Sequence, residues 1–149
     1  MPPEPFPLCD YDCGKRTTLL HLALPADIAS IGPAVQSVVE LVASEMPDRS
    51  EMQMEIGLAL QEALANAVVH GCGSVPARTV DCWVACDAAQ GLAVVVRDPG
   101  AGFDLDDEPL PLEPENLGID HGRGIHLIRE LMDEVHFQRK GAEIHMRKK

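Results

Sequence analysis

Three polar side chains recur every fourth residue within a largely apolar stretch, residues 55–71 (EIGLALQEALANAVVHG). They are Glu62, Asn66 and His70, and a helix would align them in one stripe. Neighbouring positions such as Val69 are apolar, so this helix is predicted to be apolar nearly all round. A buried carboxylate is costly unless something satisfies it. Either an internal network or a ligand must therefore engage Glu62.

A carboxylate and a carboxamide one helical turn apart can share one ligand. Magnesium prefers oxygen ligands and keeps waters and phosphate oxygens, so the amide oxygen of Asn66 and a triphosphate would suit it. Glu62 would then lie beside the metal and could orient or deprotonate a nucleophile. The alternative is a structural hydrogen bond between Glu62 and Asn66, and the pair alone does not decide. His70 could reach the phosphate end, although a capping or core role fits it about as well.

A glycine turn, DPGAG over residues 98–102, follows an apolar segment and precedes Phe103. Gly100 and Gly102 permit positive φ and let a ligand approach the backbone. Asp98, at the end of a strand, can accept a hydrogen bond from an exocyclic amine such as that of adenine, and such a bond discriminates strongly between bases. The alternative is an ordinary turn with an Asx-type hydrogen bond.

A second glycine pair, Gly122 and Gly124, opens an amphipathic segment that continues with Ile125. The start of a helix offers free N–H groups and partial positive charge, which suit phosphates. Arg123 could add a charged contact. The alternative is a flexible turn before a packing helix. A Rossmann motif is excluded because no strand directly precedes the glycines and the third glycine is absent.

Hydrophobic periodicity and turn residues predict about five strands and three helices around these motifs. Ser50 and Gln53 resemble a capping box for the central helix. The helices do not alternate one for one with the strands, which predicts an α+β two-layer sandwich: a mixed or antiparallel sheet with helices on one face. We expect a mobile arm at 1–15 and one domain at 16–149. The predicted strands are 16–24, 78–86, 92–97, 135–139 and 142–147, the helices are 27–45 (or 30–45), 50–71 and 122–132, and 104–121 is a predicted loop.

Composition narrows the function classes. The 149 residues carry a net charge of −12, which disfavours nucleic-acid binding and is compatible with a basic protein partner. No run reaches membrane-spanning length. Five cysteines and no secretory signal favour a reducing compartment, so we expect a cytoplasmic protein. Zinc at Cys9 and Cys13 with His21 is conceivable, but the spacing is no strong zinc pattern.

The order of these motifs resembles the GHKL nucleotide-binding superfamily, which includes gyrase and the histidine kinases. E-x-x-x-N on a helix, D-x-G-x-G after a strand, an acidic loop and G-x-G opening a helix follow one another. The resemblance covers residues 16–149. The segments NAVVHG and GRGIHLIRELMDEVHF look most like the anti-sigma-factor serine kinases.

The resemblance implies that the chain binds Mg-ATP and phosphorylates a serine of a STAS-domain protein of the anti-anti-sigma type. That partner would compete with a sigma factor or another target, and a homodimer is possible. Glu62 would be the general base and Asn66 would hold Mg²⁺, while residues 104–121 would form a lid over the nucleotide. The alternative function is an ATP-binding module that sequesters a partner without catalysis. The implied nucleotide-binding residues are Asn66, His70, Asp98, Gly100, Gly102, Phe103, Gly122, Arg123, Gly124 and Ile125.

Overall fold

The computed structural model describes residues 5–7, 17–71, 77–87, 91–99 and 120–149. Most of the expected N-terminal arm and nearly all of the acidic loop lie outside these ranges, as do Cys9 and Cys13. The proposed limit at residue 16 therefore stays a prediction. Within the described residues, no helix is long and apolar enough to cross a membrane.

Among the described residues, five strands form one sheet in the order β1-β2-β3-β5-β4, and every neighbouring pair is antiparallel. Both predicted hairpins, β2–β3 and β4–β5, are present. The predicted first strand is shorter than expected and ends on Pro25, which a strand at the edge of a sheet tolerates. The strands are β1 (Leu20–Pro25), β2 (Thr79–Asp87), β3 (Gly91–Arg97), β4 (Glu134–Gln138) and β5 (Glu143–Lys148).

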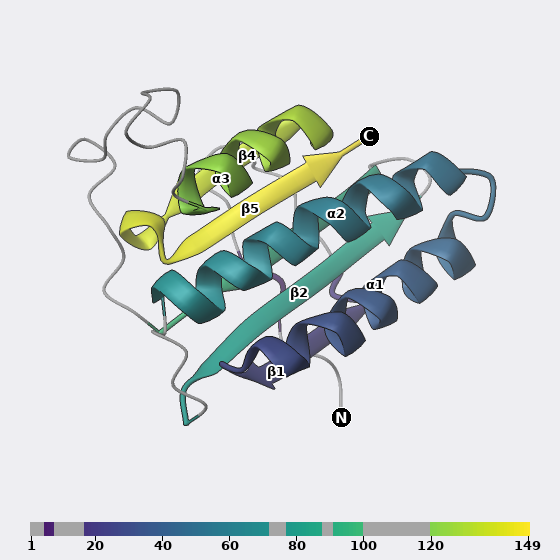
Figure 1. Cartoon of the computed structure of the whole chain (residues 1–149). Coiled ribbons are helices and arrows are strands. Elements are labelled where there is room, and N and C mark those ends of the chain that lie inside the picture. Colours follow the sequence, from purple (N-terminus) through teal and green to yellow (C-terminus); the bar gives the residue numbers. More distant parts are fainter. Residues whose placement is uncertain (1–4, 8–16, 72–76, 88–90, 100–119) are drawn as a thin grey trace.

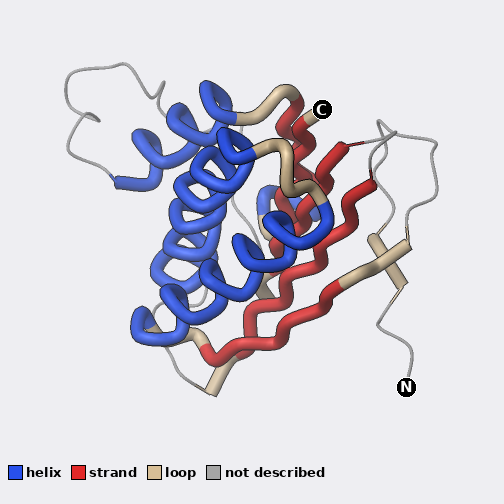
Figure 2. Tube along the Cα trace, turned by 90° about the vertical axis from the view of Figure 1, so that its right-hand side faces the viewer, coloured by secondary structure: helices blue, strands red, loops and turns tan. Residues whose placement is uncertain are grey.

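Three helices cover one face of this sheet, so the predicted α+β architecture is confirmed (Figures 1 and 2). They are α1 (Ile31–Glu45), α2 (Ser50–Asn66) and α3 (Asp120–Leu131). A π-helical turn over Ala67–Gly71 extends α2. In Figure 1, α2 lies between α1 and α3, and it packs against both.

The core lies between the helices and the sheet. Only three phenylalanines, one tyrosine and one tryptophan are present, so aliphatic side chains fill most of it. Alternate residues of β2 and β3 meet one face of α2, as the period of two along a strand requires. Full burial of each such Leu, Ile or Val contributes roughly 1.5–3 kcal/mol. Fully buried contributors include Val80, Val84, Leu92 and Val94 from the strands and Ile56, Leu60 and Leu64 from α2.

The helix starts differ from the sequence prediction in one respect. Oδ1 of Asp27 accepts a hydrogen bond from the backbone N–H of Ala29 at 3.0 Å, so Asp27 caps the 3₁₀ turn that leads into α1. The predicted capping box of α2 is wrong, because no side chain caps that helix. The flanking Arg49 instead donates from Nε to the carboxylate of Glu51 at 2.6 Å.

Candidate functional site

Glu62 and Asn66 lie in the last turns of α2, and both side chains are half-buried. Neither takes part in a hydrogen bond or an ion pair with the residues that the structure describes. The structural alternative, a hydrogen-bonded Glu62–Asn66 pair, is therefore not formed. A carboxylate and an amide left unengaged at this depth are available to a ligand.

The helix is predicted to be apolar nearly all round, but it is not buried on every side. The outer side of α2 is open: Met54 is 68% exposed, Leu58 is 45% exposed and Val69, in the following turn, is 40% exposed. Apolar residue type alone could not reveal this, because it does not tell whether a further layer covers the helices, and among the described residues none does (Figure 2). Glu62 is accordingly half-buried and not sealed in the core.

Gly124 in α3 lies close to both residues of this pair. A β-carbon built on Gly124 would lie 2.9 Å from Oε2 of Glu62, 3.3 Å from Nδ2 of Asn66 and 3.5 Å from Oδ1 of Asn66. A side chain at this position would displace the carboxylate of Glu62, so glycine leaves the space beside Glu62 and Asn66 free. The fold therefore places Gly124, from the predicted G-x-G motif, against Glu62 and Asn66, which form the predicted E-x-x-x-N motif.

The helix that carries Gly124 begins at Asp120, two residues before the predicted start. Gly122 and Arg123 lie in its first turn, where backbone N–H groups have no partner within the helix. Ile125 is buried. The start of a helix offers an anion free N–H donors and the positive end of the dipole, and Gly124, four residues beyond this start, lies beside Glu62.

Asp98 follows the last residue of β3. Its backbone N–H donates to the carbonyl oxygen of Ala142 at 2.8 Å, which continues the β3–β5 pairing beyond Arg97 and Glu143. Val96 points into the core beneath the helices. Because side chains alternate along an extended chain, Asp98 is directed to the same, helix-bearing side of the sheet.

Sequence reasoning missed a polar cluster on the opposite face of the sheet, beside this position. Glu143 is 2% exposed. It accepts a hydrogen bond from Nε of Arg97 at 2.5 Å and pairs with Nε2 of His145 at 2.6 Å. Burial raises the pKa of the Glu143 carboxyl, but the bonds to His145 and Arg97 outweigh it and hold that pKa below its ordinary value. The sequence carried a signal for this cluster: Arg97 ends one predicted strand, and Glu143 and His145 stand at alternate positions of another.

Several predicted site residues cannot be placed. Gly100, Gly102 and Phe103 lie outside the described residues, and so do the side chains of His70 and Arg123. Within the described residues, no group of three or more His, Cys, Asp or Glu side chains could hold a metal ion. The donors present at Glu62 and Asn66 fit an ion such as Mg²⁺, which takes its other ligands from phosphate and water.

The comparisons with known proteins agree with this arrangement. Residues 24–148 match the family model described as "Histidine kinase-like ATPase domain", and because the match spans most of the sequence, the chain belongs to this family. An ATPase domain implies ATP binding. A relative named "Anti-sigma F factor", from Bacillus cytotoxicus, is 30% identical over 117 residues, which is 75% of this chain and 79% of the relative. The predicted resemblance to the GHKL superfamily and its anti-sigma-factor branch is confirmed.

Proposed function

We propose that this protein is a serine/threonine kinase of a partner-switching system. It would bind Mg-ATP and phosphorylate a serine of a STAS-domain protein of the anti-anti-sigma type, and so control a sigma factor or another target. The observation that carries the proposal is the unengaged Glu62 and Asn66 meeting at Gly124. Family membership supports the nucleotide, and the similarity to an anti-sigma factor supports the regulatory role.

The mechanism needs little beyond positioning and charge neutralisation. Bound Mg²⁺ would neutralise charge on the triphosphate, with Oδ1 of Asn66 as its protein ligand. The N-terminal part of α3, with Gly122, Arg123 and Gly124, would face the phosphates. Glu62 would accept the proton of the serine hydroxyl as its oxygen bonds to the γ-phosphorus and the bond to the β–γ bridging oxygen breaks. ADP and phosphoserine are the products.

Asp98 would select the base. On the helix-bearing side of β3, its carboxylate would accept a hydrogen bond from the adenine amine, and Gly100, Gly102 and Phe103 would shape the pocket around the ring. A base without that amine would leave the carboxylate unpaired, which is the source of strong discrimination. His70 and Ile125 complete the residues that we assign to the nucleotide site.

The test is incubation with labelled ATP, magnesium and purified STAS-domain proteins from the same genome. We expect Glu62→Gln to abolish phosphoryl transfer while calorimetry shows Mg-ADP binding retained. Asn66→Ala should weaken binding of Mg-ADP. Glu51→Gln is the matched control, because it removes an exposed carboxylate from the same helix. Transfer by the Glu62→Gln variant at the wild-type rate would overturn the assignment of the base.

A second function is sequestration of a partner by the ATP-bound chain without catalysis. The similarity to a relative named "Anti-sigma F factor" supports it, because binding alone could oppose a sigma factor. The wild-type chain would then transfer no phosphate, and Glu62→Gln would leave partner control unchanged. In either case we infer a cytoplasmic protein that contacts neither nucleic acid nor membrane. A homodimer stays a prediction, and light scattering of the purified protein would test it.

A further inference from the structure

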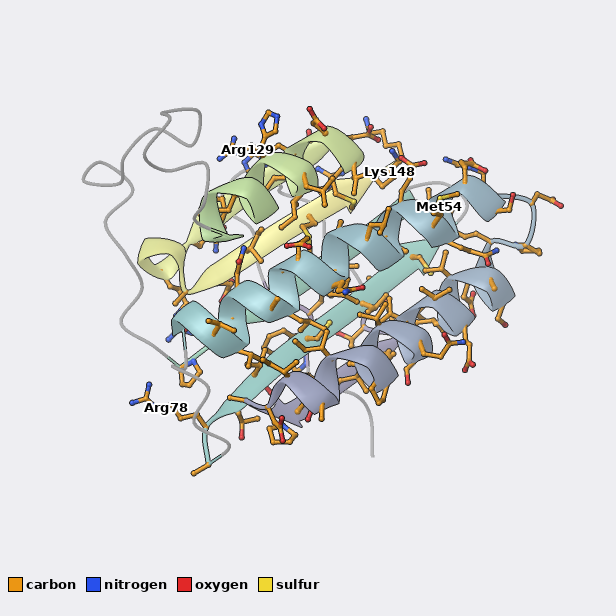
Figure 3. All side chains as sticks on the ribbon, in the orientation of Figure 1. Met54, Arg78, Arg129 and Lys148 are labelled. Carbon is orange, nitrogen blue, oxygen red and sulfur yellow. The ribbon has the colours of Figure 1, made fainter. Side chains whose placement is uncertain are left out.

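The outer side of α2 carries a line of uncharged residues, four of them exposed and one, Ala65, half-buried. Met54, Leu58 and Val69 are three of the five large hydrophobic side chains that are exposed among the described residues. Their spacing places them on one side of the helix, together with Gln61 and Ala65. These five residues are called the α2 stripe below. Figure 3 labels Met54 on α2, and Lys148 lies at the same end of the molecule.

The stripe runs beside the proposed catalytic carboxylate. Glu62 follows Leu58 by four residues, which turns it about 40° around the helix axis toward α3. From Met54 to Val69 the stripe is about 22 Å long at 1.5 Å per residue. A molecule lying along it would therefore have Glu62 at its edge, on the side where α3 and Gly124 approach.

The surroundings of the stripe are acidic. Between Ile31 and Gly71 the helices and their connection hold one arginine or lysine, Arg49, and six carboxylates, which are Glu40, Glu45, Asp48, Glu51, Glu55 and Glu62. Arg49 is bonded to Glu51, and Lys148 from β5 is bonded to Glu55. Neither cation is left to offset the remaining carboxylates. An apolar line with acidic flanks suits a partner that is apolar along one side and basic beside it.

We propose that the α2 stripe is the docking surface for the protein substrate, which presents an amphipathic helix with basic flanks. The length of the stripe matches about four turns of helix, and packing of one apolar helix side on another is a common mode of recognition. The inference rests on the proposed kinase function, because docking along α2 serves to bring a serine to Glu62.

A second copy of this chain is a poorer occupant. Two stripes packed face to face would bring the acidic flanks of α1 and α2 in one copy against those in the other, and α3 adds no net charge because Asp120 and Glu130 balance Arg123 and Arg129. Like charges juxtaposed across an interface oppose association. The charge of the helical layer therefore favours a basic partner over self-association.

The kinase arm of the test compares Met54→Asp and Leu58→Asp with Ile28→Asp. Ile28 is a matched control, since it is 64% exposed but precedes α1, away from the stripe. Toward a STAS-domain protein that the wild-type chain phosphorylates, the two stripe variants should raise KM about tenfold or more, as loss of an interface anchor does. Their kcat and their affinity for Mg-ADP should stay at the wild-type values, as should KM of Ile28→Asp.

A peptide arm separates this inference from the proposed function, because it needs no phosphoryl transfer. The probes are two synthetic 18-residue amphipathic helices with the same leucine side, one with lysine flanks and one with glutamate flanks. The lysine peptide should bind the wild-type chain and Ile28→Asp about tenfold more tightly than the stripe variants, and the glutamate peptide should bind none of them. If the chain shows no kinase activity, the proposed function fails, but peptide binding still tests whether the α2 stripe is a docking surface.

Two results would overturn the inference. The first is equal binding of the lysine peptide, or equal KM, for wild type, Met54→Asp and Leu58→Asp. The second is a wild-type dimer in light scattering that Met54→Asp dissociates and Ile28→Asp does not, because the stripe would then be an interface between two copies.

Discussion

Replacing Gly124 by alanine should separate function from stability in this protein. The new methyl group would enter the space where α3 meets Glu62 and Asn66. At 2.9 Å from Oε2 of Glu62, it would be about 0.5 Å short of an ordinary 3.4 Å contact. Because that oxygen ends a flexible side chain, we expect Glu62 to turn aside while the helices keep their positions.

The effects on folding nearly cancel. Gly124 is the fifth residue of α3, where alanine is favoured over glycine by about 1 kcal/mol. Moving the Glu62 side chain off its rotamer costs about 0.5–1.5 kcal/mol. The net change in the free energy of unfolding should therefore stay within about 1 kcal/mol, which corresponds to a Tm shift of about 4 °C or less.

The effect on chemistry should be much larger. Displacement of a catalytic group by about 1 Å can cost about a hundredfold in rate, so we expect kcat for phosphoryl transfer from labelled ATP to fall by about that factor. Circular dichroism reports the Tm, and calorimetry reports Mg-ADP affinity, which the methyl group beside Asn66 should also lower.

Gly57→Ala is the matched control for the helix effect. It lies inside α2, and its β-carbon would meet Cγ2 of Val39 at an ordinary 3.4 Å. We expect wild-type transfer and a Tm that is equal or higher. Wild-type kcat and Mg-ADP affinity in Gly124→Ala would refute the assignment of this space to substrate and nucleotide.

Three further predictions concern the sheet. Since the pKa of Glu143 is lower in the folded protein, its contribution to stability should be complete above its ordinary pKa and fall as the pH drops below about 4.5; urea unfolding at several pH values should show this loss in wild type and not in Glu143→Gln. Burial, with the charge of Asp81, raises the pKa of the Cys82 thiol to about 12, so iodoacetamide at pH 8 should label Cys82 only after unfolding, as peptide mass spectrometry would show. Asp98→Ala should lower ADP affinity about tenfold or more and abolish the preference for ADP over inosine diphosphate, measured by calorimetry.

Much of the fold followed from local patterns. The apolar, strand-like segments of β2 and β3 flank a turn, so an antiparallel hairpin was predictable, and the alternating segments of β4 and β5 around Lys140 and Gly141 predicted the second one. The predicted capping box at Ser50 was wrong. A match of two residues is weak evidence for a capping box, because other groups can satisfy the free N–H groups at the start of a helix. The sheet order was not predictable, since β5 pairs with β3 across about 45 residues of chain and no local signal selects that partner.

The candidate site, like the fold, was predictable only in part from the sequence. The residue types of Glu62, Asn66 and Asp98, with their spacing, were enough to suggest a nucleotide and its metal. The exposure of these side chains was not predictable. Apolar neighbours such as Met54 indicate a buried helix unless the number of layers in the fold is known. The pairing of Arg97 with Glu143 also escaped prediction, since it depends on the register between distant strands.

By itself, the sequence determined which segments become helices and strands, and which of them carry a carboxylate, an amide and glycines at spacings that suit Mg-ATP. Those properties depend on neighbours within one or two turns. Only the tertiary structure decided that Gly124 lies against Glu62 and Asn66, that the outer side of α2 stays open, and that Glu143 is buried with its partners. Each of these depends on how two layers pack, and packing joins residues too far apart in the chain for any local pattern to record.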